Sequence, residues 1–274
     1  MSEATPPGIP STDETILRTV RDRYGQIAQL SPPGGCASSC CGDGAGGSCC
    51  SPGTPCGVNE YSPEQIASLP EGAFLGLGCG NPTALLSLAA GETVLDLGSG
   101  GGIDCFLAAH QVGPTGHVVG VDMTPEMVAR SRKTAREGGY SNVEFRLGEI
   151  EHLPVPDARV DVVLSNCVLN LSLDQDQVYR EAFRVLRPGG RLLVSDMLAT
   201  RPIPPEARED PHRWSACSSG ARTEEDVERA LQSVGFSDII ITTARSSEVA
   251  PRSGAIDDLG VVPGTVSATK PTRG

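Results

Sequence analysis

The chain has 274 residues, of which 38% are apolar and 20% charged, a composition typical of a globular protein with one main domain. Its formal net charge of −12 and the absence of a Lys or Arg block argue against a nucleic-acid partner, because phosphate contacts need clustered cations. No apolar run approaches the roughly 20 residues that cross a bilayer, and the amino terminus lacks a secretory-signal pattern. We therefore expect no membrane partner and a cytoplasmic location.

The first predicted element is an amphipathic helix over residues 11–30. Ser11 and Glu14 form a capping-box pattern, and apolar side chains recur on one face of the helix. Residues 31–57 lose this periodicity and are rich in Gly, Ser and Pro, which predicts a linker that carries six of the ten cysteines. A second capping box, beginning at Ser62, predicts a short helix.

From residue 92 the pattern alternates between strand and helix. Apolar strands are predicted at residues 93–98, 117–123, 143–148, 160–166 and 191–197, with helices at 102–113, 124–139 and 174–186. Strands that are apolar nearly throughout predict a parallel sheet buried on both faces, which is a doubly wound, Rossmann-like α/β fold. A further helix and strand are expected within 223–244, and residues 264–270 are predicted to add a last strand at the sheet edge.

A glycine-rich turn follows the first of these strands. Gly98, Gly100 and Gly102 stand where an open parallel sheet binds ligands, at the carboxyl ends of its strands. The third glycine of the dinucleotide fingerprint is absent, and so is the lysine of a phosphate loop. Asp122 ends the next strand, where a carboxylate accepts ribose hydroxyls, and Asp96 is placed to attract an ammonium group. The set suits a nucleoside with a cationic amino-acid arm.

The run VLDLGSGGG, followed by GVDM, LGEIEHLP and FRVLRPGGRLLVSD, resembles the successive motifs of class I S-adenosylmethionine-dependent methyltransferases. The resemblance implies S-adenosylmethionine as cofactor, bound by Asp96, Gly98, Gly100, Gly102, Asp122, Met123, Glu149, Ile150 and Asn166. The glycines would hold its methionine arm, Asp122 its ribose and Glu149 with Ile150 its adenine, while Asn166 would lie near the reactive methyl group. Three simpler roles remain open: a turn only for Gly100, helix capping for Asp122, and a surface carboxylate at Glu149.

Four cysteines lie beyond the linker. Cys79, Cys167 and Cys217 fall in segments that can reach the ligand edge of the sheet, whereas Cys105 lies among apolar residues of a predicted helix. Without a secretory signal the thiols are expected to be reduced. Soft thiolates select soft centres, and the histidines have no zinc-site spacing relative to these cysteines. Packing remains an alternative for each cysteine.

The segments LGLGCGNP, SNCVLNLS and DPHRWSAC together resemble the arsenite methyltransferases. The resemblance implies that Cys79, Cys167 and Cys217 bind trivalent arsenic, supplied as arsenite or a thiol conjugate, which is methylated for detoxification. It also implies that a linker thiol, Cys41 or Cys56, assists redox turnover, with thioredoxin or glutathione as reductant.

The rival interpretations are a small-molecule, quinone-type C-methyltransferase with structural cysteines and a non-enzymatic, thiol-rich metalloid-binding protein. On the leading interpretation the chain divides into three parts. Residues 1–60 hold the first helix and the cysteine-rich linker, and residues 61–200 form the S-adenosylmethionine-binding methyltransferase domain. Residues 201–274 complete the arsenic site and the sheet and end in a loose tail.

Overall fold

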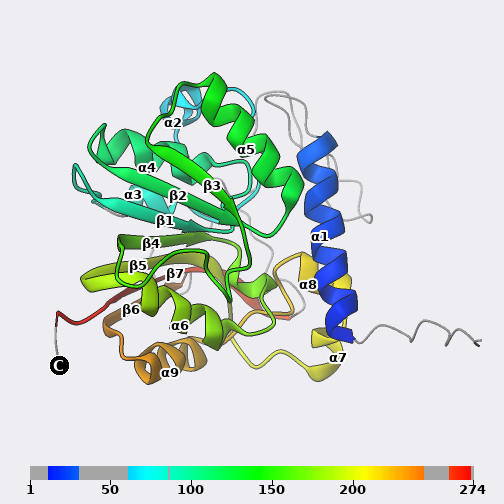
Figure 1. Ribbon diagram of the computed structural model, residues 1–274. Coiled ribbons are helices and arrows are strands. Elements are labelled where there is room, and N and C mark those ends of the chain that lie inside the picture. Colours follow the sequence, from blue (N-terminus) through cyan, green and yellow to red (C-terminus); the bar gives the residue numbers. More distant parts are fainter. Residues whose placement is uncertain (1–11, 31–60, 86, 244–258, 273–274) are drawn as a thin grey trace, which may run out of the picture.

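A computed structural model describes residues 12–30, 61–85, 87–243 and 259–272. At its centre is a seven-stranded sheet with the order β3-β2-β1-β4-β5-β7-β6 (Figure 1). The strands are β1 (Thr93–Leu97), β2 (His117–Asp122), β3 (Val143–Leu147), β4 (Val160–Asn166), β5 (Leu186–Ala199), β6 (Ser237–Thr243) and β7 (Val261–Thr269). The predicted doubly wound α/β fold is therefore confirmed.

Helices cover both faces of the sheet and one of its ends. Those before β4 are α1 (Thr12–Leu30), α2 (Pro63–Ser68), α3 (Pro82–Leu85), α4 (Ile103–Val112) and α5 (Pro125–Glu137). After β4 come the 3-10 turn η2 (Leu169–Leu171) and the helices α6 (Gln175–Val185), α7 (Pro205–Arg208), α8 (Pro211–Ser215) and α9 (Glu224–Val234). The second capping box is formed as predicted, with Ser62 accepting from the Gln65 N–H at 3.2 Å and the Gln65 side chain accepting from the Ser62 N–H.

The strand order places the ligand edge beside β1. This strand pairs in parallel with β2 on one side and β4 on the other, so the chain order reverses between β1 and β4. A crevice opens outside the carboxyl ends of parallel strands at such a switch point. The glycine-rich turn after β1, Asp122 at the end of β2 and Asn166 at the end of β4 all lie at this edge.

The last strand departs from its predicted place. Residues 264–270 were expected at the sheet edge, but β7 lies between β5 and β6 and is antiparallel to both. Inside the sheet β7 has neighbours on both sides, and Val266 and Ala268 are buried in the core. The edges of the sheet are instead β3 and β6.

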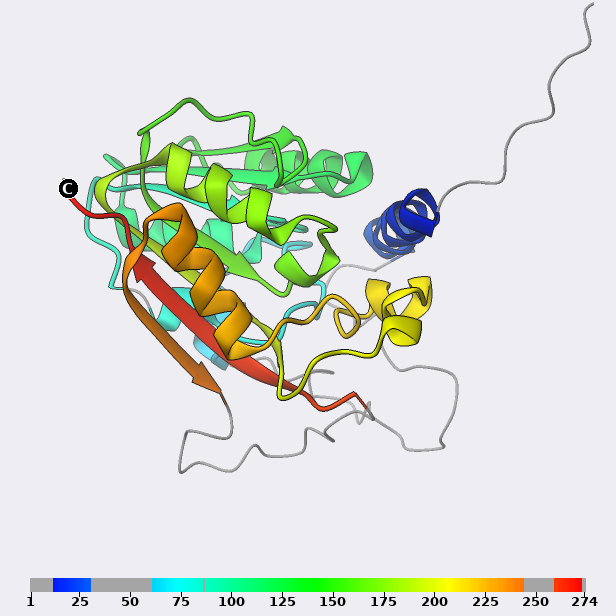
Figure 2. The same cartoon turned by 90° about the horizontal axis from the view of Figure 1, so that it is seen from below.

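Two hydrophobic clusters hold the helices against the sheet. On one face α4 and α5 pack over Val94, Val118 and Val162, and on the other face α6 and α9 pack over Leu95 and Leu97. Alternate residues of β1 thus serve opposite faces, because side chains alternate along a strand. Figure 2 shows α6 and α9 side by side over the sheet, and the two helices are in contact.

Helix α1 stands at the ligand end of the sheet. It contacts α5 and α8, and Figures 1 and 2 show it apart from the sheet itself. Its apolar face, which includes Ile16 and Val20, is buried against Leu171, Trp214 and Cys217. Within the described part of the chain, none of the helices combines the length and the apolar character needed to cross a membrane.

Candidate active site

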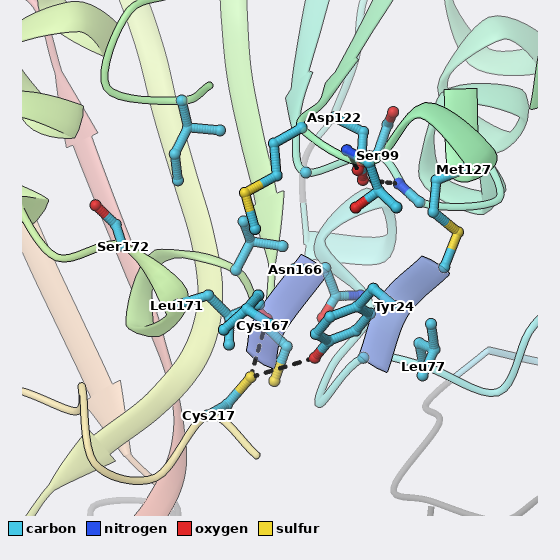
Figure 3. A pocket seen from close by; sticks show the side chains of 18 of the residues that line it. Tyr24, Leu77, Ser99, Asp122, Met127, Asn166, Cys167, Leu171, Ser172 and Cys217 are labelled. Atoms are coloured by element: carbon cyan, nitrogen blue, oxygen red, sulfur yellow. Dashed lines mark hydrogen bonds between the residues drawn. The ribbon is translucent and has the colours of Figure 1, made fainter. Parts of the chain in front are cut away.

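A cavity of about 1010 Å³ lies at the ligand edge of the sheet. Its walls come from α1, the segment 73–79, the glycine-rich turn and the segment that follows α8. In Figure 3, Asp122 and Ser99 lie at one end of this cavity, and Cys167 and Cys217 lie at the other. The residues predicted for the cofactor and the sulfur atoms therefore line one cavity.

The three glycines of the turn meet different local requirements. Gly98, Gly100 and Gly102 have φ angles of +68°, +50° and +93°, a region that favours glycine. A Cβ atom at Gly98 would lie 2.4 Å from Val168, whereas a Cβ at Gly100 would meet nothing within 4 Å. Gly98 is thus required by packing, and Gly100 leaves the backbone exposed to the cavity.

Asp122 both caps the neighbouring backbone and lies at the cavity. It lines the cavity, and its carboxylate also accepts from the Gly100 N–H at 2.9 Å and from the Thr124 N–H at 2.8 Å. These bonds fix the turn and the start of α5 relative to β2. A carboxylate offers about four acceptor positions, so two backbone bonds leave capacity for a ligand.

Buried carboxyl groups give the cavity its electrostatic character. Burial raises the pKa of Asp104 to about 6 and raises that of Asp122 as well. Burial, and after it the Asp104 carboxyl, raise the pKa of Asp96 well above its usual value. Among the described lining residues, six carboxylic acids stand against one arginine, Arg23. Such a cavity favours a cationic ligand, which would compensate the desolvated carboxylates.

Asn166 holds two cavity walls together. Its side-chain oxygen accepts from the Cys79 N–H at 3.1 Å, and its amide nitrogen donates to Gly80 O at 2.8 Å and to the Tyr61 hydroxyl at 2.9 Å. Tyr61 in turn donates to Asp104 at 2.7 Å. The structure therefore places Asn166 in the cavity wall, where it anchors the Cys79 segment to the end of β4. Sequence reasoning missed Asp104, because a carboxyl in the first turn of α4 suggested only an ordinary helix start.

The remaining residues predicted for the cofactor also line the cavity. Met123 and Ile150 contribute apolar surface, and Ile150 is buried. Glu149 forms an ion pair with Arg21 of α1 at 2.6 Å, in which both side chains are about half exposed. Such an exposed pair contributes little to stability, about 1 kcal/mol or less, but it joins α1 to the loop after β3.

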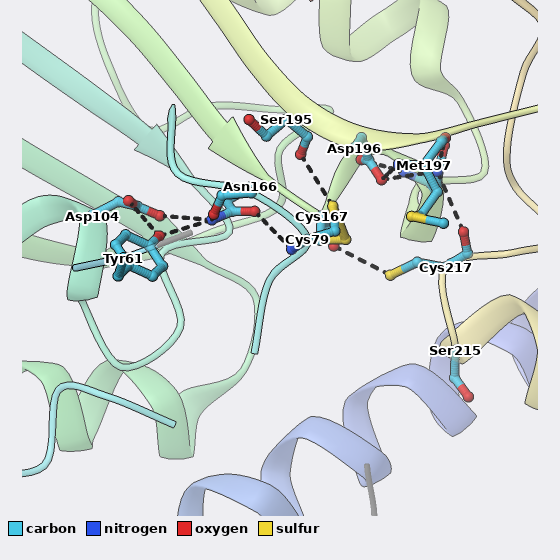
Figure 4. Close-up of a disulfide and its surroundings, with 12 residues drawn as sticks. Tyr61, Cys79, Asp104, Asn166, Cys167, Ser195, Asp196, Met197, Ser215 and Cys217 are labelled. Atoms are coloured by element: carbon cyan, nitrogen blue, oxygen red, sulfur yellow. Dashed lines mark hydrogen bonds between the residues drawn. A yellow bond between two sulfur atoms is a disulfide. The ribbon is translucent and has the colours of Figure 1, made fainter. Parts of the chain in front are cut away.

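The sulfur atoms gather at the opposite end of the cavity. Cys79 and Cys167 form a disulfide, with their Cα atoms 5.7 Å apart, and the Cys217 sulfur lies 3.3 Å from the Cys167 carbonyl oxygen (Figure 4). Sequence analysis expected free thiols at these positions, whereas the structure joins two of them. The separation of the two Cα atoms is in the range that a disulfide bridges, which accounts for the difference.

Cys217 is a buried, neutral thiol. Burial, and after it the nearby Asp196 carboxylate, raise its pKa to about 12. The hydroxyl of Tyr24, on α1, lies 3.9 Å from its sulfur. Sequence reasoning missed Asp196 and Tyr24, although an acidic residue at the end of a buried strand was a usable signal.

Cys105 is the remaining cysteine among the described residues. Cys105 is fully buried in α4, as expected, and its thiol donates to Asp96 at 3.2 Å. Cys41 and Cys56, the predicted redox partners, lie outside the described residues.

Comparisons with known proteins agree with this geometry. Residues 88–235 match a family described as a methyltransferase domain. The chain is 46% identical over 271 residues to an arsenite methyltransferase of Halobacterium salinarum, covering 95% of this chain and 68% of that protein. It is 44% identical over 168 residues to an arsenite methyltransferase of Aquipseudomonas alcaligenes, covering 59% of this chain and 48% of that one.

A solved structure is similar over most of the fold. It is an arsenic(III) S-adenosylmethionine methyltransferase from Chlamydomonas reinhardtii, 32% identical with a TM-score of 0.60, covering 77% of this chain and 71% of that one. The chain thus spans between about half and two thirds of the length of the two curated relatives named above.

Proposed function

Since this chain belongs to the arsenite methyltransferase family, we propose that it transfers a methyl group from S-adenosylmethionine to trivalent arsenic held by Cys79, Cys167 and Cys217. The observation that carries the proposal is the convergence of these three cysteines, from three separate segments, at one end of the cavity whose other end is lined by the glycine-rich turn.

The residues of the glycine end fit S-adenosylmethionine. The open space at Gly100 allows a ligand to approach the backbone, and the buried Asp96 and Asp122 suit a ligand that carries positive charge. When bound, this cofactor supplies an electrophilic methyl group attached to a positively charged sulfur. We assign the methionine arm to Asp96 and the glycine-rich turn, the ribose to Asp122, and the adenine to the neighbourhood of Glu149 and Ile150.

The sulfur end provides the ligands for the substrate. Trivalent arsenic bound by three thiolates keeps a lone pair on the side away from the sulfurs, and that lone pair is the nucleophile. The reaction then needs no general base, because arsenic carries no proton to remove. Catalysis rests on holding the reacting groups in line, a contribution that can reach several kcal/mol.

We assign the Cys79–Cys167 pair to the redox part of the cycle. Methylation takes arsenic formally from the +3 to the +5 state, and closure of two thiolates to a disulfide releases the two electrons that return it to +3. The Cys79–Cys167 pair is suited to this step because its sulfurs already reach one another. A thiol reductant, such as thioredoxin or glutathione, must then reopen the pair, and the reduced thiols of the cytoplasm suit this reaction.

The test is product analysis with single cysteine variants. The reduced full chain is incubated with arsenite, S-adenosylmethionine and a thioredoxin system, and the arsenic species are separated by chromatography. We expect methylated arsenic from the wild type and its loss in Cys79→Ser, Cys167→Ser and Cys217→Ser. Cys105→Ser is the matched control, since a serine hydroxyl can keep the hydrogen bond to Asp96.

Two outcomes would favour the rival functions. Unchanged methylation of arsenic in all three variants would remove the cysteines from the reaction and favour a methyltransferase for small molecules. Stoichiometric retention of arsenic without any methylated product would favour a metalloid-binding protein.

A further inference from the structure

Of the three cysteines at the sulfur end of the cavity, Cys217 is the one that forms no disulfide. It reaches the site on the segment after α8, 50 residues beyond Cys167. The polar contacts of its side chain are the 3.3 Å approach to Cys167 O and the 3.9 Å approach of the Tyr24 hydroxyl, and both involve a weakly hydrogen-bonding sulfur. Other groups must therefore hold this segment against the sheet.

Asn170, in η2, connects the Cys217 segment to β5. The residue is 3% exposed, and its side-chain nitrogen donates to Asp196 Oδ1 at 2.9 Å and to Met197 O at 2.6 Å. The same nitrogen lies 3.4 Å from Cys217 O. One buried amide thus contacts the end of β5 and the backbone of Cys217.

Gln175, at the start of α6, extends the connection. Its side-chain nitrogen donates to Gly220 O at 2.8 Å and lies 3.3 Å from the side-chain oxygen of Asn170. The two segments are also in very close backbone contact, since a Cβ atom at Gly220 would lie 1.9 Å from Asn170 O. The Cys217 segment is therefore fixed at two carbonyl groups by two buried amides.

Asp196 links these amides to the other two sulfurs. Its carboxylate accepts from the Met197 N–H at 2.7 Å and lies 3.4 Å from the Asn170 backbone nitrogen. One of its oxygens and the sulfurs of Cys79 and Cys167 all lie within 4.8 Å of one another. Figure 4 shows Asp196 and Met197 beside the disulfide, with Cys217 next to them. We call Asn170, Gln175 and Asp196 the Asn170 network.

The backbone at Cys167 and at Cys217 needs such support. Cys167 and Cys217 have φ angles of +58° and +61°, a conformation that costs a residue other than glycine roughly 1 to 2 kcal/mol. A residue stays there only when its surroundings determine its conformation. For Cys217, the Asn170 network provides these surroundings, because the Asn170 amide contacts the carbonyl group of Cys217.

We propose that the Asn170 network is a positioning device that sets the distance of Cys217 from the Cys79–Cys167 pair, so that three sulfurs reach one arsenic atom once the thiol reductant has opened the disulfide. The inference rests on the proposed function, because arsenic is the centre that the sulfurs share. Asn170 is a positioning residue and acts only through Cys217. Its loss should release the third sulfur and leave two sulfurs and the cofactor end of the cavity intact.

The chain contains its own reporter for this site. Trp214 is its single tryptophan, lies three residues before Cys217, and donates to Leu171 O at 3.1 Å. Arsenite titrations of the reduced full chain can therefore follow tryptophan fluorescence. Asn170→Ala is compared with Asn142→Ala, which removes a similar amide bond, to Gly113 O at 3.0 Å, near the amino ends of β2 and β3.

We expect Asn170→Ala to raise the arsenite dissociation constant by roughly 10- to 100-fold, the usual effect of losing a group that orients a metal ligand. S-adenosylmethionine affinity, measured by calorimetry, should change less than about twofold, and Asn142→Ala should match the wild type in both assays. X-ray absorption at the arsenic edge should show three sulfur neighbours in the wild type and two in Asn170→Ala. A purely structural role would lower the melting temperature without changing the number of sulfurs around arsenic.

An unchanged arsenite affinity and sulfur count in folded Asn170→Ala would overturn the proposal. If Asn170→Ala does not fold, Gln175→Met replaces it as the test, because this change keeps the side-chain volume and removes the bond to Gly220. An unchanged arsenite affinity and sulfur count in Gln175→Met would also overturn the proposal. Failure of the proposed function would be distinguishable from failure of this inference. In that case even the wild-type chain would show no arsenic bound by three cysteine sulfurs.

Discussion

The binding of S-adenosylmethionine should strengthen as the pH rises from 5 to 7. The cavity contains buried carboxyl groups whose pKa values burial raises, with that of Asp104 at about 6. A raised pKa means that the carboxyl is partly protonated, and so uncharged, in the free protein at pH 5. A cationic ligand favours the ionised form, so the affinity is lowest at low pH and increases as the carboxyl loses its proton.

The size of the effect follows from Asp104. A carboxyl with a pKa of about 6 is roughly one-tenth ionised at pH 5 and roughly nine-tenths ionised at pH 7. If the cofactor binds the ionised form, its dissociation constant falls about tenfold over this range, or about 1.4 kcal/mol. Ionisation of Asp96, which burial and Asp104 oppose, would act in the same direction.

Calorimetry at several pH values, in buffers with different heats of ionisation, measures both the affinity and the protons released. Tyr61→Phe is the diagnostic variant, because the Tyr61 hydroxyl bond lowers the pKa of Asp104. Its loss should shift the midpoint of the affinity change to higher pH. An affinity that stays constant from pH 5 to 7, with no proton release, would refute the electrostatic account of the cavity.

Two further predictions concern the glycine-rich turn and the disulfide. Gly98→Ala and Gly139→Ala each place a Cβ at a positive φ, +68° and +73°, but the Cβ at Gly98 meets Val168 at 2.4 Å, whereas the Cβ at Gly139 meets nothing within 4 Å. Urea unfolding should show a loss of about 1 kcal/mol for Gly139→Ala and at least about 2 kcal/mol more for Gly98→Ala, and equal losses would contradict the packing argument. Reduction of the Cys79–Cys167 disulfide opens a loop with a sequence separation of 88, whose closure is worth up to about 5 kcal/mol. The melting temperature of the wild type should fall by roughly 10 °C on reduction, and that of Cys79→Ser should not change. Equal melting temperatures of the oxidised and reduced wild type would show that the disulfide adds no stability.

The glycine end of the cavity was predictable because its determinants are local in sequence. The turn from Gly98 to Gly102 directly follows a buried strand, and Asp122 ends the neighbouring strand, so parallel pairing brings them together. The sequence could not decide between capping and ligand binding at Asp122. The structure shows why the choice was open, since one carboxylate can hold the Thr124 N–H and still face the cavity.

The place of β7 was not predictable in the same way. A short stretch with alternating apolar residues suits either an edge strand or an inserted strand, because this pattern does not show which strands it pairs with. The insertion depends on pairing with β5, more than 60 residues earlier in the chain, along nine matched positions from Arg191↔Thr269 to Ala199↔Val261. Such long-range register is set by the whole sheet.

At the sulfur end of the cavity, sequence motifs predict which cysteines are present but not how they are arranged. Cys167 follows a parallel strand, so its place at the ligand edge could be inferred from the sequence. Cys217 follows a short helix, and the sequence does not predict where that helix lies relative to the sheet. Neither residue belongs to a type that favours a positive φ, so their left-handed backbone must be imposed by contacts from elsewhere. The contacts come from buried amides such as Asn170, which in sequence is one polar residue in an apolar run. A motif therefore identifies the sulfur donors, while the distances between them depend on polar side chains such as Asn170, whose partners lie far away in the sequence.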